Sequence, residues 1–160
     1  MIVSVLIVLF ALVTTVQSQP ADSVYVFLSP SCPVCKASTK ALQQLQKDNP
    51  SVAFVGVVDT ASADSAEVAE FYSDYKLRMD VRWDSKTLAE RFKATTTPEV
   101  VVLHNGKRVY QGRIDNQYEA LGKRRRVVNV NDLRDVLDVL ARGAVPSFRR
   151  TIPVGCFLEK

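Results

Sequence analysis

The order of apolar and polar positions along the chain separates strand-like from helix-like segments. Residues 24–28 are five consecutive apolar residues, a pattern that predicts a strand buried on both faces of a sheet. Residues 52–59, VAFVGVVD, predict a second buried strand. Between them, the apolar residues at 41–45 recur at helical spacing, and Asn49-Pro50 ends that helix. This part of the chain therefore predicts a β-α-β unit.

The middle of the chain continues the alternation. Apolar side chains at 68–75 recur at i, i+3, i+4 and i+7, which places them on one face of an amphipathic helix. Residues 79–83, MDVRW, alternate like a strand. Residues 88–92 predict a short helix, with Asp84 or Ser85 as its N-terminal cap.

The remaining elements are a hairpin and a last helix. Residues 99–114, EVVVLHNGKRVYQGRI, predict two strands joined at Asn105-Gly106, the strongest short-range hairpin signal. After a polar segment, Asn131 is placed to cap a helix with apolar residues at 133–140, and Gly143 ends it.

This order of elements predicts an α/β fold. Helices between strands require parallel neighbours, and the hairpin adds an antiparallel pair. We therefore expect a mixed central sheet with helices on both faces. A chain of 160 residues has room for one such domain, which we assign to residues 19–145. Residues 146–160 show neither a helical nor a strand-like hydrophobic periodicity, and we assign them as a tail that carries Cys156.

The N-terminus has the pattern of an export signal. Residues 2–13 are almost wholly apolar, and Val16 and Ser18 lie where a signal peptidase requires small side chains. We therefore assign residues 1–18 as a cleaved signal peptide. An uncleaved N-terminal membrane anchor is the alternative, although the apolar stretch is shorter than the roughly 20 residues of a spanning helix.

The net charge of +4 is largely local, because the segment KRRR at 123–126 and the pair Arg149-Arg150 supply much of it. We interpret the KRRR segment as a solvated surface loop. No aromatic residues are interleaved with KRRR, and we expect no nucleic-acid partner.

Two cysteines, Cys32 and Cys35, frame Pro33-Val34 just after the first predicted strand. A pair at this spacing can bind a metal, form a disulfide or carry out redox exchange. At a helix N-terminus, unpaired N–H groups and the helix dipole stabilise a thiolate. They can lower a cysteine pKa from about 8.5 to between roughly 3.5 and 7.5. Cys35, one turn later, lies beneath Cys32 and is placed to resolve a mixed disulfide.

The other chemistries have less support. A zinc site needs three or four ligands, and the chain offers one further cysteine and one histidine. We expect that histidine, His104, at the hairpin tip and far from the CPVC loop. We expect no metal site, although a copper site formed by Cys32, Cys35 and Cys156 stays open. A purely structural disulfide also stays open, but one that closes so short a loop constrains the unfolded chain very little.

With CPVC after the first strand and TTTPE at 95–99 before the hairpin, the chain resembles the thioredoxin superfamily from about residue 24 to residue 142. The resemblance implies a thioredoxin-like fold in which the proline before the hairpin is cis and faces the cysteines. It makes Pro98 and Thr97 candidate substrate-binding residues. Thioredoxins also place a buried proton acceptor six residues before the first cysteine. That position is Val26 here, so Glu99 becomes the candidate proton acceptor.

A narrower resemblance is to exported redoxin-domain proteins of the alkyl hydroperoxide reductase/thiol-specific antioxidant type. It is based on an α-β insertion at 60–84, on TTTPEVVVL, on VYQGRIDNQY and on the late sequence PVGCFL. The peroxidatic pattern of peroxiredoxins is absent around Cys32. Members of this group keep the late Gly-Cys, which makes Cys156 a candidate resolving thiol.

We therefore expect a thiol–disulfide oxidoreductase that acts outside the cytosol, periplasmic or secreted, through the redox pair Cys32 and Cys35. Its partners would be protein disulfides or dithiols and a redox partner protein. Neither a metal nor a nucleotide cofactor is implied, because the cysteine pair is itself the redox centre. A thiol-dependent peroxidase and a copper-binding module are the alternatives.

Overall fold

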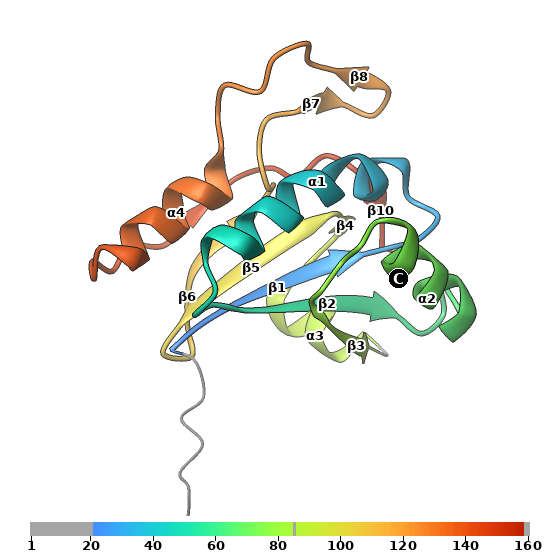
Figure 1. The fold of residues 1–160 in the computed structure, drawn as a ribbon, viewed down its shortest axis with the longest axis horizontal. Helices are drawn as coiled ribbons and strands as arrows, with labels where there is room; N and C mark the ends of the chain where they lie inside the picture. The colour runs from blue at the N-terminus through green and yellow to red at the C-terminus, as the bar shows by residue number, and fades with distance from the viewer. Residues whose placement is uncertain (1–20, 85, 159–160) are drawn as a thin grey trace, which may run out of the picture.

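The computed structural model describes residues 21–84 and 86–158, and Figure 1 shows the arrangement of their helices and strands. In chain order, the elements are β1 (Asp22–Leu28), α1 (Pro33–Asp48), β2 (Ala53–Asp59), α2 (Ser65–Asp74), β3 (Asp80–Asp84), α3 (Thr87–Phe92), β4 (Thr96–Thr97), β5 (Glu99–His104), β6 (Lys107–Gly112), β7 (Tyr118–Ala120), β8 (Lys123–Arg124), α4 (Asp132–Ala141), β9 (Arg149–Arg150) and β10 (Cys156–Phe157).

The core of the fold is a six-stranded mixed sheet with the strand order β3-β2-β1-β5-β6-β9. Strands β1, β2 and β3 run parallel, since α1 and α2 provide the connections between them. Strand β5 pairs antiparallel with β1 and with β6, and Asn105 and Gly106 form the tight turn between β5 and β6 with positive φ. The predicted mixed sheet is thus confirmed.

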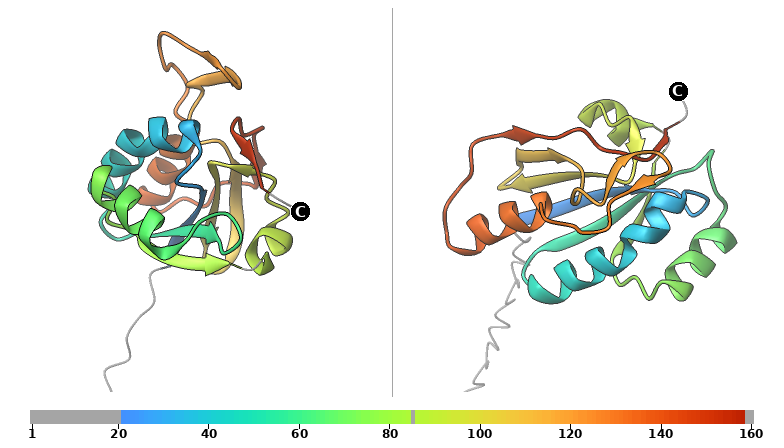
Figure 2. Two further views of the ribbon diagram at one scale, coloured as in Figure 1. Left: turned by 90° about the vertical axis from the view of Figure 1, so that its right-hand side faces the viewer. Right: turned by 90° about the horizontal axis from the view of Figure 1, so that it is seen from above.

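Helices cover both faces of this sheet, as predicted (Figure 2). Val26 and Val102 face α1, α2 and α4, in the larger hydrophobic cluster, which also contains Cys32. Their neighbours Phe27 and Val101 face α3, in the smaller cluster. Successive residues of β1 and β5 thus alternate between two covered faces, which is why these strands appear in the sequence as continuous apolar runs.

The helix caps agree only in part with the sequence. The Asp84 carboxylate accepts hydrogen bonds from the backbone N–H groups of Leu88 and Ala89 at 2.9 and 3.0 Å, so its side chain caps α3 as expected, although Lys86 occupies the N-cap position. Ser85 lies outside the described residues. Asn131 occupies the N-cap position of α4, but its side chain makes no capping hydrogen bond. The expectation for Asn131 therefore holds for its position and is wrong for its contact.

Two segments without a predicted strand form short pairings. The segment at 118–124 folds into the hairpin β7–β8, which projects from the domain in Figure 1. Residues 123–126 are exposed, as expected for a solvated surface, and Glu119 forms ion pairs with Lys123 and Arg125. The tail supplies β9, which extends the main sheet beside β6, and β10, which pairs with β4.

The expected signal peptide or anchor, residues 1–18, lies outside the described residues. Within residues 21–84 and 86–158, none of the helices combines the length and the apolar composition needed to cross a bilayer.

Candidate active site

The fold places Cys32 at the junction between β1 and α1. The backbone N–H of Cys32 donates to the Ser29 carbonyl at 3.1 Å, which closes the turn after the strand. Cys32 is extended (φ −78°, ψ 118°) and is the N-cap residue of α1, and Pro33 fills the first helical position, where no N–H is needed. The Cys32 sulfur therefore lies at the positive end of the helix dipole, as predicted.

A second loop brings Thr97 and Pro98 to the same place. The peptide bond between them is cis. As a thiol, Cys32 donates a hydrogen bond to the Thr97 carbonyl oxygen at 3.2 Å across 65 positions of sequence. Cys35, in the first turn of α1, is fully buried in the same cluster as Cys32. The structure thus brings together four of the predicted site residues, Cys32, Cys35, Thr97 and Pro98.

The tail brings the third cysteine to this site. Strand β10 pairs antiparallel with β4, and Cys156 lies directly opposite Thr97. The Thr97 hydroxyl donates to the Cys156 carbonyl at 3.4 Å. Cys156 packs against the cluster that contains Cys32 and Cys35, and all three cysteines are free thiols. From the sequence alone the tail could not be placed, because nothing in its pattern indicates where it binds.

Ionisation of Cys32 is strongly favoured. The Cys35 thiol donates to the Cys32 sulfur, and this hydrogen bond is the main cause that lowers the Cys32 pKa from 9.0 to about 4. The Cys156 thiol and the backbone N–H groups of Cys35 and Cys156 act in the same direction, whereas burial opposes them. On ionisation, Cys32 gives up its bond to the Thr97 carbonyl and accepts these hydrogen bonds instead. Cys32 is therefore the thiol of this site that ionises most readily.

The two neighbouring thiols behave in the opposite way. Burial raises the pKa of Cys35 well above 9.0, and the hydrogen bond to the Cys32 thiolate and its charge raise it further. Burial, together with contact to the same thiolate, raises the pKa of Cys156 to about 11. Near neutral pH the site therefore holds one thiolate between two thiols.

Glu99 does not lie where a proton acceptor for Cys35 would have to lie. It pairs with Phe27 across β1 and β5, and its side chain points to the face covered by α3, away from the cysteines. Its carboxylate accepts hydrogen bonds from the Thr95 N–H at 2.9 Å and from the Gln111 amide at 2.6 Å. The expectation for Glu99 is corrected to a buried structural role, since one step along a strand reverses the face.

A shallow groove adjoins the candidate active site on the side of Pro98. Its walls come from α1, from the loop after β6, from β7 and from the tail, and its lining includes Val34, Ser38, Pro98, Ile114, Asp115, Tyr118 and Val154. Burial raises the pKa of the Asp115 carboxyl. Ile114, Tyr118 and Val154 belong to the motifs VYQGRIDNQY and PVGCFL, but no local pattern indicates that they line one groove, because they come from different segments.

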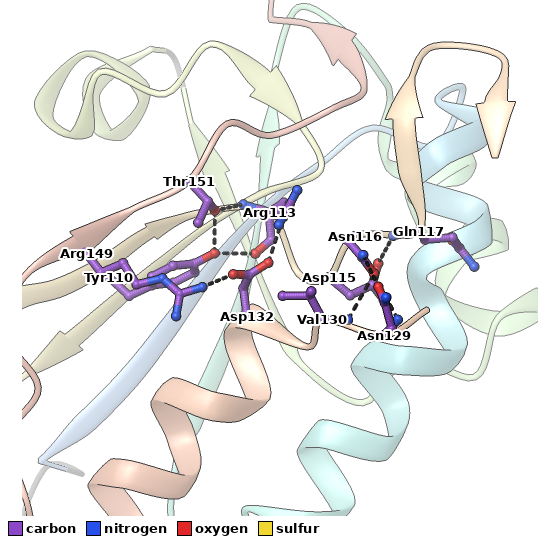
Figure 3. Close-up of polar contacts among 10 residues, drawn as sticks. All are labelled: Tyr110, Arg113, Asp115, Asn116, Gln117, Asn129, Val130, Asp132, Arg149 and Thr151. Carbon is purple, nitrogen blue, oxygen red and sulfur yellow. Dashed lines mark hydrogen bonds and ion pairs between the residues drawn. The ribbon is translucent and has the colours of Figure 1, made fainter. Parts of the chain in front are cut away.

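A polar network anchors the tail just before it reaches the cysteines (Figure 3). Asp132, fully buried at the start of α4, binds Arg113 Nε at 2.6 Å and also forms an ion pair with Arg149. The Tyr110 hydroxyl donates to the Arg113 carbonyl at 2.6 Å and contacts the Thr151 hydroxyl at the same distance. This network, which we call the tail anchor, joins β6, α4 and the tail.

His104 lies at the far end of β5 from Thr97, as predicted. Its Nδ1 contacts Asp22 at 2.7 Å, and its Nε2 contacts the Asn105 amide at 2.9 Å. In the part of the chain that the structure describes, no group of three or more His, Cys, Asp or Glu residues is arranged to hold a metal ion.

Comparison with known sequences gives one family. Residues 23–109 match the sequence model of a family described as thioredoxin-like, and this match spans more than half of the chain. No curated protein sequence gives a significant match.

Solved structures share the fold. An uncharacterized conserved protein from Geobacillus kaustophilus has a TM-score of 0.76 at 19% identity, over 88% of this chain and 78% of that chain. A hypothetical protein from Sinorhizobium meliloti has a TM-score of 0.73 at 22% identity, over 86% and 79%. A secreted disulfide oxidoreductase from Mycobacterium tuberculosis, homologous to E. coli DsbE, has a TM-score of 0.51 at 29% identity, over 56% and 67%.

Proposed function

This chain belongs to the thioredoxin-like family, and from that premise we propose that it catalyses thiol–disulfide exchange through Cys32 and Cys35. One observation carries the proposal. A cysteine at a helix N-terminus, with its pKa lowered to about 4, lies beside a second, fully buried cysteine and next to a cis-proline. Such a pair supplies an attacking thiolate and a resolving thiol without any further cofactor.

The first step is attack of the Cys32 thiolate on one sulfur of a substrate disulfide. A Cys32–substrate mixed disulfide forms, the substrate S–S bond breaks, and the departing sulfur takes up a proton. The charge on Cys32 disappears in this step. Because that charge and its hydrogen bond help to raise the Cys35 pKa, we expect the Cys35 pKa to fall once the mixed disulfide exists.

The second step is the attack of Cys35 on the Cys32 sulfur. Cys35 loses its proton, bonds to Cys32 and releases the second substrate sulfur as a thiol. The products are a Cys32–Cys35 disulfide and a reduced substrate, so two electrons pass from the protein to the substrate. The reverse sequence oxidises a dithiol substrate, and a redox partner protein restores the starting form in either direction.

The Thr97–Pro98 loop lies beside the sulfur atoms, where it can align an extended substrate backbone. Protein disulfides or dithiols are therefore the proposed substrates. We also propose that the protein acts outside the cytosol. The export-like pattern of residues 1–18 and the similarity to a secreted disulfide oxidoreductase support this location. Expression of the full chain with N-terminal sequencing of the product tests it, and cleavage after Ser18 is the expected result.

Insulin reduction with a regenerating thiol tests the activity. Cys32→Ser is expected to abolish it, because neither remaining thiol is ionised near pH 7. The double variant Cys35→Ser/Cys156→Ser is expected to accumulate a Cys32–substrate mixed disulfide, since it keeps the nucleophile and lacks both neighbouring thiols. Cys32→Ser protein as active as the wild type would refute the proposed function.

A further inference from the structure

The proposed function assigns the backbone beside Pro98 to substrate alignment, but its residue Thr97, in β4, is already paired with the tail. Strand β10 pairs along the edge of β4, with Cys156 opposite Thr97 and Phe157 opposite Thr96. Cys32 is only 1% exposed, although it is the proposed nucleophile. A protein disulfide cannot reach its sulfur while β10 lies on this edge.

We propose that the C-terminal strand is a tethered substrate, with Cys156 in the position of a substrate cysteine and able to exchange with the Cys32–Cys35 couple. This inference rests on the proposed function and adds to it a third redox residue and an order of events. A Cys32–Cys156 disulfide forms within the chain, and an external protein substrate reaches Cys32 only after β10 leaves.

The approach of the tail to β4 is built into the sequence at Gly155. A Cβ atom at this position would lie 1.9 Å from the Thr97 carbonyl oxygen and 2.7 Å from its carbon. Only glycine permits such close contact between the two backbones. One residue later the Cys156 carbonyl accepts from the Thr97 hydroxyl, and the Leu158 N–H donates to the Thr95 carbonyl at 3.0 Å.

The tail is held firmly before this strand and weakly within it. The tail anchor binds Arg149 to Asp132 and Thr151 to Tyr110 (Figure 3). The Thr151 N–H also donates to the Gln111 carbonyl at 3.0 Å. Beyond it, the pairing of β10 with β4 is two residues long, and Phe157 is 82% exposed. Release of β10 therefore breaks few contacts while the anchor keeps Cys156 close, so that its effective concentration at Cys32 is on the order of millimolar.

The exchange needs no additional oxidant. Starting from the Cys32–Cys35 disulfide, Cys156 loses its proton to solvent and attacks the Cys32 sulfur. The bond to Cys35 breaks, the Cys35 sulfur takes up a proton, and a Cys32–Cys156 disulfide remains. One disulfide is consumed and one is formed, so the oxidation state of the protein does not change. The disulfide now includes a cysteine on a displaceable strand, where a partner thiol can attack it.

Disulfide mapping tests the proposal. The full chain is equilibrated with mixtures of reduced and oxidised glutathione, quenched in acid, alkylated and mapped by peptide mass. We expect Cys32–Cys156 beside Cys32–Cys35 in the wild type. We expect at least a tenfold lower ratio of Cys32–Cys156 to Cys32–Cys35 in Gly155→Ala. Ile152→Ala is the matched control, since this tail side chain is 83% exposed, and it should match the wild type.

A second variant keeps the tail intact in case Gly155→Ala lowers the yield of folded protein. In Cys35→Ser, the Cys32 thiolate has only Cys156 as an internal partner, and a monomer with a Cys32–Cys156 disulfide is expected. The access of a protein substrate to Cys32 is measured separately, as the rate of insulin reduction divided by the rate of reduction of the small substrate hydroxyethyl disulfide. Gly155→Ala should raise this ratio several-fold, because the larger substrate depends more strongly on release of β10.

The two proposals fail in different ways. Wild-type protein that reduces insulin but forms no Cys32–Cys156 disulfide, in Cys35→Ser as well as in the native chain, overturns the tethered substrate and leaves the proposed function standing. Protein that forms the Cys32–Cys156 disulfide but reduces no insulin instead contradicts the proposed function.

Discussion

Removal of the Cys156 thiol is expected to make Cys32 a weaker acid. The variant Cys156→Ala deletes one S–H donor to the Cys32 sulfur and leaves the backbone N–H of residue 156 in place. The Cys35 thiol and backbone remain as donors as well. The variant therefore isolates the electrostatic effect of one side chain contributed by the tail.

The magnitude follows from the contacts of the Cys32 sulfur. Hydrogen bonds from Cys35, and then from Cys156, lower its pKa from 9.0 to about 4, while burial raises it. A hydrogen bond to a charged group contributes about 1.5–3 kcal/mol, and about 1.4 kcal/mol changes a pKa by one. Loss of the Cys156 thiol should therefore raise the Cys32 pKa by about one to two, to between about 5 and 6.

The assay is the pH dependence of Cys32 alkylation by iodoacetamide, with the modified cysteine identified by peptide mass. Since only the thiolate reacts, the wild-type rate should fall by half near pH 4 and stay level above it. In Cys156→Ala the midpoint should move to between about pH 5 and pH 6. Cys156→Ser retains a hydroxyl donor and serves as the control, with a smaller change.

The variant Cys35→Ala is the reference against which the pKa change in Cys156→Ala is judged. Cys35→Ala removes the largest cause of the low pKa and should raise the Cys32 pKa more than Cys156→Ala does. A midpoint that is unchanged in Cys156→Ala, in an assay that detects the change in Cys35→Ala, would refute the inferred contact between the tail and the nucleophile.

Two further variants test the contacts that hold the site in place. Asp132→Ala removes a fully buried carboxylate from its two arginine partners. Because these arginines are about a third exposed or more, we expect a loss of about 2–3 kcal/mol, less than for a fully buried pair, in urea unfolding. The same variant should lower the fraction of Cys32–Cys156 disulfide. Gln111→Leu leaves one oxygen of the buried Glu99 carboxylate without its donor, and we expect it to lower the free energy of unfolding by about 2–3 kcal/mol, with unchanged alkylation of Cys32.

The sequence predicts the sheet and its helices well because each element carries its own local pattern. Residues 24–28 and 100–103 pack against covered layers on both faces of the sheet, so they appear as unbroken apolar runs. The position of Cys32 follows from the same logic, since a strand, a turn and Pro33 together define where the helix begins.

The position of the tail and the sheet face to which the Glu99 side chain points depend on contacts that no local sequence pattern encodes. Strand β10 has two residues, and its position follows from the close packing of Gly155 against Thr97. Glu99 follows the cis-proline, so sequence position alone suggested that it lies near the cysteines. Its direction is set by its pairing with Phe27. The pairing between strands that are distant in sequence therefore sets both the position of the tail and the direction of the Glu99 side chain.

The central claim is that Cys32 and Cys35 form a reversible redox couple, and its reduction potential tests that claim most directly. At pH 7, a Cys32 pKa of about 4 stabilises the reduced form by about 4 kcal/mol, which corresponds to about 90 mV. Relative to thioredoxin at about −270 mV, we predict about −180 mV in glutathione buffers, with Cys32 and Cys35 oxidised together in the molecules that do not carry the Cys32–Cys156 disulfide. Cys32 and Cys35 that remain thiols at every glutathione ratio would contradict the account.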